Sequence, residues 1–190
     1  QLMINFNLCY EIPGGKGTYI APQLLGDNQP ESDWDERDNL ILRYTSPSFM
    51  PKGIATRFIV AMHRDIEDQT NVWKSGVVLN RNDTRAEVIE DYGKREVRIR
   101  VSGQHKKELM NIVTYRLDEI YDSFGGLEDN LLIPCNCSQC LGSQEPHFYA
   151  FENLKRRIVN VQFQSQCEKS VEHGDVRRLI DDVAAPRQIS

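Results

Sequence analysis

Residues 49–79, FMPKGIATRFIVAMHRDIEDQTNVWKSGVVL, contain the signals that decide the fold. Pro51 suits the first position of a helix, where its missing N–H leaves no hydrogen bond unmade. Apolar residues then recur every four positions, at Ile54, Phe58, Met62 and Ile66. This spacing predicts a half-buried helix, and the apolar run at 72–79, which contains Trp73, predicts a strand after it.

Three shorter strands are predicted before this segment. Residues 4–12 alternate apolar and polar side chains, and we expect further strands at 18–25 and 39–46. The connecting residues 26–39 are acidic, and Trp34 is their only large apolar residue. We therefore expect a surface loop between the second and third strands.

A β-hairpin is predicted at 84–91 and 94–102, turning about Tyr92-Gly93. If Asp91 pairs with Lys94, the outer face opposes Glu87 to Arg98 and Arg85 to Arg100, and the inner face opposes Val88 to Val97 and Ala86 to Ile99. The inner apolar pairs favour this register, because a slip of one residue would expose all of them.

A second long helix is predicted from about residue 106 to residue 123. Its apolar residues follow the 3-4-3 spacing of a buried stripe: Leu109, Ile112, Val113, Leu117, Ile120, Tyr121 and Phe124. The economical arrangement is an α+β fold, in which two long helices pack on one face of a mainly antiparallel sheet.

The character of the sequence changes after Gly126. We expect a short helix at 148–158, a strand at 159–166 and a last helix at 175–183, capped by Asp175. These expectations divide the chain into a larger unit at 1–125, a small Cys-rich subdomain at 126–185 and a frayed tail at 186–190.

Four of the five cysteines lie in the small subdomain: Cys135, Cys137, Cys140 and Cys167. Thiolates at this spacing suit a tetrahedral zinc ion, with three ligands from one tight turn and the fourth from a distant strand. Free thiols and an oxidised or redox-active site are the alternatives, and His147 and His173 are reserve ligands. Because four protein ligands close a zinc site, such an ion would be structural.

Other motifs give weaker indications of chemistry. The segment 14–18, GGKGT, lacks the spacing of a phosphate-binding loop, so we expect no nucleotide there. We interpret His63 as a histidine on the flank of the first helix with a local hydrogen bond. Phe49 and Trp73 are candidate core anchors, although either residue could contact a partner instead.

A basic strand surface is expected from Lys94, Arg95, Arg98 and Arg100. Acidic residues interleave with it, which favours a solvated face with salt bridges; a docking surface for another domain is the alternative. The net charge of −5 argues against nucleic acid as a partner of the whole chain. No apolar stretch is long enough for a membrane span.

The cysteine pattern also bears on cellular location. An odd number of cysteines with a C-x-C-x-x-C cluster suits a reducing compartment better than a disulfide framework. We therefore expect a cytoplasmic protein. The chain begins without Met and in the middle of a pattern, so we expect it to be part of a larger protein.

Residues 2–124 resemble the C-terminal half of the COR domain of Roco proteins. The resemblance rests on the strand at 6–10, the strand at 19–25, Phe49-Met50-Pro51-Lys52-Gly53, Arg57-Phe58-Ile59-Val60, His63, and the run from Val72 to Leu79. It implies a non-catalytic module that couples an adjacent Ras-like Roc GTPase domain to homodimerisation and conformational change. The Cys-containing remainder resembles an extension found after COR in some prokaryotic Roco-like and leucine-rich-repeat proteins.

Two other function classes remain open at this point. A zinc-stabilised adaptor or nucleic-acid-binding module would use the cysteines together with Arg98 and Arg100. A hydrolase would use Cys9, Cys137 or Cys167 as nucleophile with a histidine, which requires a thiol of depressed pKa.

Overall fold

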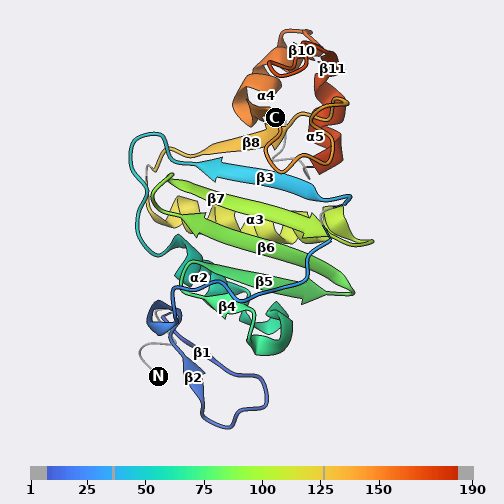
Figure 1. Cartoon of the computed structure of the whole chain (residues 1–190). Helices are drawn as coiled ribbons and strands as arrows, with labels where there is room; N and C mark the ends of the chain where they lie inside the picture. Colours follow the sequence, from blue (N-terminus) through green and yellow to red (C-terminus); the bar gives the residue numbers. More distant parts are fainter. Residues whose placement is uncertain (1–7, 36, 126, 184–190) are drawn as a thin grey trace.

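A computed structural model describes residues 8–35, 37–125 and 127–183. These residues form a seven-stranded antiparallel sheet with the strand order β4-β5-β6-β7-β3-β8-β9 (Figure 1). The strands are β3 (Leu40–Thr45), β4 (Val72–Trp73), β5 (Gly76–Arg81), β6 (Thr84–Asp91), β7 (Glu96–Ser102), β8 (Asn130–Pro134) and β9 (Phe148–Ala150). The predicted α+β class with a mainly antiparallel sheet is confirmed.

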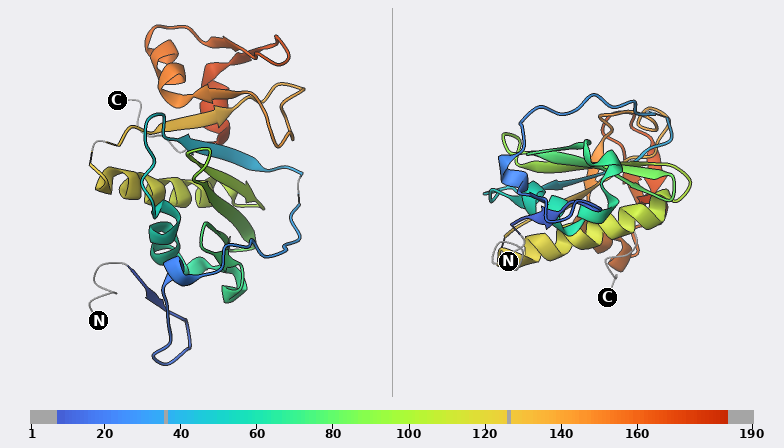
Figure 2. Two further views of the ribbon diagram at one scale, coloured as in Figure 1. Left: turned by 60° about the vertical axis from the view of Figure 1, so that its left-hand side comes forward. Right: turned by 90° about the horizontal axis from the view of Figure 1, so that it is seen from below.

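Helices cover one face of the sheet, which we call the inner face. They are α2 (Ile54–Ala61), α3 (Lys106–Ser123), α4 (Phe151–Val159) and α5 (Val176–Val183). Helix α2 packs on α3, and α5 contacts both α3 and the strands β3 and β8. Figure 2 shows α3 on one side of the sheet and the segment between β2 and β3 crossing the other side, the outer face.

Along each strand, side chains point alternately to the inner and the outer face, and those on the inner face form the core with the helices. In β3, Leu42 and Tyr44 are fully buried, whereas the alternating residues Ile41 and Arg43 point to the outer face. The hydroxyl of Tyr44 donates a hydrogen bond to Asp118 on α3 (2.7 Å), and its ring stacks on Tyr121. The sheet and α3 are therefore joined by a polar contact inside an apolar layer.

The hairpin of β6 and β7 forms where it was predicted, but its register is displaced by two residues. Asp91 pairs with Glu96, so Glu87 faces Arg100 and Val88 faces Ile99. The turn is longer than expected because Arg95 adopts a left-handed conformation (φ 54°) and its N–H donates to the carbonyl of Tyr92. A displacement of two residues keeps every side chain on its predicted face.

The first helix is shorter than its apolar stripe predicted. Helix α2 begins after Gly53, whose φ of 94° favours glycine, and it ends at Ala61. Short 3-10 turns follow at His63–Asp65 and Glu67–Gln69. Ile66 is buried as expected, but it reaches the core through an isolated bridge to Leu79 of β5.

The N-terminal strands form a separate small hairpin. It consists of β1 (Tyr10–Glu11) and β2 (Tyr19–Ile20), which are much shorter than the strands predicted at 4–12 and 18–25. The first part of the predicted 4–12 strand lies outside the described residues. A 3-10 turn at Pro22–Leu24 replaces the end of the second predicted strand, because proline cannot donate to a ladder.

The C-terminal region combines α4 and α5 with a second small hairpin, β10 (Gln164–Gln166) and β11 (His173–Asp175). Asp175 caps α5 as predicted, since its carboxylate accepts from the N–H of Arg177 (2.9 Å). Apolar residues of α4 and α5 share one core with the inner face of the sheet. The division at residue 125 stays a prediction, and the tail at 186–190 lies outside the described residues.

Within the described part of the chain, no helix combines the length and the hydrophobicity that crossing a membrane requires.

Candidate metal centre

The four C-terminal cysteines converge at the junction of β8, β9 and the β10–β11 hairpin. The Sγ atoms of Cys135, Cys137, Cys140 and Cys167 all lie within 4.8 Å of one another. Cys140 Sγ and Cys167 Sγ are 3.7 Å apart, which is far too long for a disulfide bond. All four thiols are free.

Three of these cysteines are placed by a tight turn that follows β8. Cys135 extends the pairing of β8 with β9 by one step, because its N–H donates to the carbonyl of His147 (2.7 Å). The carbonyl of Cys137 then accepts from the N–H groups of Cys140 and Leu141, and Gly142 ends the turn in the left-handed region (φ 76°). The C-x-C-x-x-C spacing thus folds into one knuckle.

The fourth cysteine comes from the turn between β10 and β11. The N–H of Cys167 donates to the carbonyl of Glu172, and the N–H of Val171 donates to the carbonyl of Cys167. These two bonds close the loop and direct Cys167 toward the knuckle, where its side chain is fully buried. Cys140 and Cys167 therefore lie close together although 27 residues separate them in the sequence.

Several donors point at the sulfur atoms. The N–H of Cys137 donates to Cys135 Sγ (3.4 Å), the N–H of His147 to Cys140 Sγ (3.3 Å), and the hydroxyl of Ser170 to Cys137 Sγ (3.2 Å). Donors of this kind stabilise thiolates and orient them, as the outer shell of a metal site does. Tyr149 Oη adds a longer contact to Cys135 Sγ (3.7 Å).

The arrangement fits a tetrahedral zinc ion. Zinc–sulfur bonds of about 2.3 Å in a regular tetrahedron place the sulfur atoms about 3.8 Å apart. The distance between Cys140 Sγ and Cys167 Sγ is already 3.7 Å, and no other pair of the four sulfur atoms is more than 4.8 Å apart. A zinc ion there would tie the two turns together and would leave no coordination position open for a substrate.

The environment acts differently on individual thiols. Burial raises the pKa of Cys135 to about 12. Burial also opposes ionisation of Cys167, but the hydroxyl and N–H of Ser170 and the N–H of Lys169 outweigh it and lower the pKa to about 6. Cys167 therefore provides a thiolate near neutral pH, although its burial closes it to a substrate.

The other sequence candidates lie apart from this cluster. Cys9 is a buried free thiol before β1. The side chain of His147 faces Glu168 and Tyr149, and His173 is exposed on β11, so neither histidine belongs to the sulfur cluster. Nδ1 of His63 contacts the carbonyl of Val60 (2.8 Å), which confirms the local hydrogen bond that was predicted.

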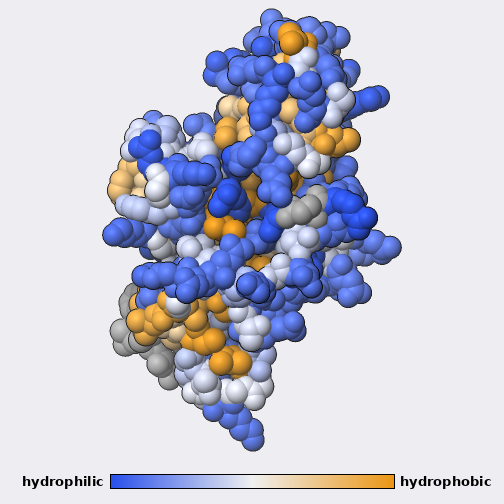
Figure 3. Space-filling model, in the orientation of Figure 1, coloured by the Kyte–Doolittle hydropathy of each residue, from blue (hydrophilic) through white to orange (hydrophobic). Residues whose placement is uncertain are grey.

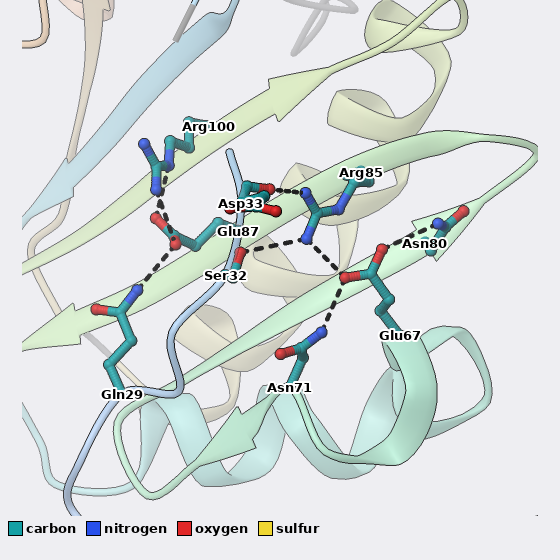
Figure 4. A network of polar contacts seen from close by, with 9 residues as sticks. All are labelled: Gln29, Ser32, Asp33, Glu67, Asn71, Asn80, Arg85, Glu87 and Arg100. Carbon is teal, nitrogen blue, oxygen red and sulfur yellow. Dashed lines mark hydrogen bonds and ion pairs between the residues drawn. The ribbon is translucent and has the colours of Figure 1, made fainter. Parts of the chain in front are cut away.

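The basic strand surface is part of a polar network on the outer face (Figure 4). Arg100 contacts Glu87 through two nitrogen atoms (2.7 and 3.0 Å), and Gln29 donates to the same carboxylate. Nearby, Arg85 donates to Glu67 (2.7 Å), to Ser32 and to the carbonyl of Asp33. Salt bridges on the predicted basic surface thus join Arg100 to Glu87 and Arg98 to Glu96 (3.7 Å).

Trp34 explains how the acidic loop is held on this face. The guanidinium groups of Arg85 and Arg100 lie 5.0 and 4.4 Å from the ring of Trp34, and its indole N–H donates to Asn39. Cation–π contacts of this kind attach a loop without a covalent link. The described residues of the loop, 26–35 and 37–39, therefore lie across the outer face, and we call them the strap.

Two features of the surface were not predicted. Phe49 is 63 % exposed and lines a groove of about 410 Å³ with Pro51, Phe124 and Leu127. A second groove of about 540 Å³ lies on the outer face between the strap and the cysteine knuckle, and Arg43 and Arg98 line it. The alternation of side chains along β3 was enough to predict that Arg43 points away from the core. It was not enough to predict that Arg43 lies opposite Arg98, because the sequence did not reveal which strands are neighbours.

These features define an α+β module with a sheet covered by helices on one face, a cluster of four cysteines and two surface grooves. Residues 37–182 match the family "C-terminal of Roc, COR-B domain". No curated protein matches the chain in sequence. The match spans most of the chain, so the protein belongs to the COR-B family, and the predicted membership is confirmed.

Proposed function

We propose that this chain is a non-catalytic module of a Roco-type GTPase and that it couples the Roc GTPase domain to conformational change. Support comes from the family, whose COR-B domains follow Roc. Further support comes from the sulfur cluster, in which three of the four cysteines are buried, so that it offers little access to a substrate. A reducing, cytoplasmic location would keep its thiols available for metal.

The exposed side chain of Phe49 is the observation that carries this proposal. A large aromatic residue at the N-terminal end of α2 would normally be buried, yet it lines an open groove beside the C-terminal end of α3. Pro51, Phe124 and Leu127 make the groove apolar, and aromatic residues in such positions are typical interface hot spots. We propose that the Roc domain docks here, where it contacts two helices of the core at once.

Titration of the Roc GTPase domain of the same protein into this chain tests the proposal. Replacement of Phe49 by Glu should weaken binding by about tenfold or more in calorimetry, since a charge would enter an apolar contact. Tyr115→Glu is the matched control, because Tyr115 is a similarly exposed aromatic residue (61 %) on α3. Equal affinities for the parent chain and Phe49→Glu would contradict this docking site.

We also propose that two copies of the chain associate, as the resemblance to COR implies. Light scattering of the chain alone and together with its Roc domain measures the association. A strict monomer under both conditions, combined with GTP hydrolysis that does not respond to this module, would contradict dimerisation.

We propose further that Cys135, Cys137, Cys140 and Cys167 bind one structural zinc ion. The close approach of four sulfur atoms and the donors aimed at them support this assignment over free thiols. A bound ion would cross-link the knuckle to the β10–β11 turn, and the four cysteines would coordinate the ion as thiolates.

Elemental analysis of protein purified without added metal measures the number of zinc ions per chain. We expect a single zinc ion per chain, loss of the ion in Cys137→Ser, and retention in Cys9→Ser, which changes a cysteine outside the cluster. Metal-free protein whose five thiols all react with a thiol reagent would favour free cysteines. Loss of two hydrogens per chain in the intact mass would favour a disulfide instead.

A further inference from the structure

The groove on the outer face, which we call the outer groove, is the larger of the two grooves. Its volume is about 540 Å³, and its walls are the strap and the residues that follow the cysteine knuckle. Apolar side chains of Ile41 and Ile89 belong to its lining. Figure 3 views this side of the molecule and shows small hydrophobic areas between hydrophilic surfaces. The groove therefore combines an apolar base with a polar rim.

Two arginines stand directly opposite each other in this groove. Arg43 of β3 pairs with Arg98 of β7, and both side chains point to the outer face. Like charges at directly opposed positions of antiparallel strands destabilise a sheet, because their Cβ atoms are only about 5 Å apart. A neighbouring pair shows the ordinary solution: Arg100 of β7 lies opposite Glu87 of β6.

The hydrogen-bonding capacity of the arginine pair is not filled. Nε of Arg43 and Nε of Arg98 are both buried and have no hydrogen-bond partner among the described residues. The carboxylate of Glu96 lies 3.7 Å from Nε of Arg98, which is beyond hydrogen-bonding distance. Arg43 is also held in place, because Phe148 stacks on its guanidinium group at 4.5 Å. Two guanidinium charges with an incomplete set of acceptors thus lie at one point of the groove.

Glu145 acts as an internal counter-ion at this point. It follows the knuckle, and its carboxylate accepts from Nη2 of Arg43 (2.8 Å) while its side chain is 66 % exposed. Arg43 lowers the pKa of Glu145, and the charges of Lys94 and Arg98 add to the effect. Arg43 itself is only 13 % exposed, so the carboxylate is the half of this ion pair that is open to solvent. A carboxylate from another molecule can therefore take its place on Arg43.

We propose that the outer groove binds an acidic peptide segment of a partner protein, with a carboxylate on Arg43 and Arg98 in place of Glu145. The apolar base formed by Ile41 and Ile89 suits the side chains that flank a carboxylate in such a peptide. A nucleic acid fits less well, because Arg43 and Arg98 can hold one carboxylate at one point, whereas a polyphosphate chain needs a continuous basic track, which Asp38, Glu87 and Asp182 interrupt. This site is separate from the groove at Phe49.

Fluorescence anisotropy with a short labelled peptide that alternates glutamate and leucine tests the site in the full 190-residue chain. We expect binding that weakens with salt, and Arg98→Gln should weaken it about tenfold because a charge-assisted hydrogen bond is lost. Glu145→Gln should strengthen binding about threefold, since the internal competitor loses its charge. A lysine–leucine peptide should not bind.

Stability measurements separate binding from folding. Arg98→Gln removes the repulsion with Arg43 but also the 3.7 Å contact with Glu96, so its thermal midpoint should stay close to that of the parent chain even though the peptide is lost. Arg116→Gln, which removes the same charge from an exposed pair with Glu119 on α3, is the matched control and should bind normally. Unchanged binding in Arg98→Gln, weaker binding in Glu145→Gln, or displacement of the peptide by an equal concentration of inorganic phosphate would overturn the proposal.

Discussion

Trp73 lies so close to the backbone of Gly76 that a side chain at residue 76 would overlap its indole ring. A Cβ atom placed on Gly76 would stand 2.2 Å from Cζ2 and 2.6 Å from Cε2 of Trp73. The indole is 3 % exposed and cannot move into solvent without losing its core contacts. Gly76→Ala should therefore lower the free energy of unfolding by about 1–3 kcal/mol in urea titrations.

Gly26 provides the control for this substitution. A Cβ atom on Gly26 would meet no heavy atom within 4 Å, so Gly26→Ala should change stability by less than about 0.5 kcal/mol. Equal losses at the two positions would show that contact with Trp73 is not the cause.

Glu67 links stability to pH. Burial opposes its ionisation, but hydrogen bonds from Arg85, Asn80 and Asn71 and the charge of Arg85 outweigh burial and lower the pKa of Glu67. A carboxyl with a lowered pKa adds stability above its ordinary value of 4.5, and this stability is lost as pH falls through the folded-state pKa. Glu67→Gln should cost about 1–2 kcal/mol at pH 7.

Denaturant titrations at several pH values test this expectation. The difference between the parent chain and Glu67→Gln should shrink as pH falls below about 4.5. Glu119→Gln, at an exposed carboxyl with one arginine partner, should be nearly neutral at every pH. A difference for Glu67→Gln that stays constant down to low pH would rule out the linkage.

Single residues were predicted with uneven success, and the reason is physical. The spacing of Cys135, Cys137 and Cys140 restricts three sulfur atoms to one turn, so the cluster could be inferred from sequence. Phe49 and Trp73 have similar hydrophobicity, yet one is exposed and the other is buried. Only the packing of neighbouring elements distinguishes them, and a single sequence does not contain it.

Among the elements, long periodic segments were predicted best. Helix α3 occupies Lys106–Ser123, where a stripe of seven apolar residues specifies both its face and its length. The β6–β7 hairpin was placed correctly, but its register depends on Arg95 adopting a positive φ, which non-glycine residues rarely do. The length of α2 was overestimated. Its apolar stripe continues beyond Ala61 because the 3-10 turns that follow also bury Ile66.

The zinc proposal makes a prediction for the C-terminal elements. Removal of the ion by a chelator should raise amide hydrogen exchange in β10 and β11, since Cys167 would lose its link to the knuckle. The amides of β5, β6 and β7 should stay protected, because their ladder contains no cysteine. Cys9→Ser should exchange like the parent chain. Equal exchange in β10 and β11 before and after chelation would contradict a structural role for metal.

At the scale of the whole molecule, the fold class was predictable and the strand order was not. Alternation and helix stripes indicated a sheet with helices on one face, which the structure confirms. The position of β3 between β7 and β8 depends on pairings between segments more than 50 residues apart (Leu40 with Val101) and more than 80 residues apart (Thr45 with Asn130). Such pairings leave no local signal in the sequence.

The central place of β3 has a consequence for synthesis of the chain on the ribosome. This strand emerges before both of its neighbours, of which the first is complete only at Ser102 and the second only at Pro134. Until then both edges of β3 present unpaired N–H and C=O groups, which attract other chains. A nascent polypeptide halted before Glu96 accordingly leaves both edges of β3 open, and closure of the sheet waits for translation of the strands that follow.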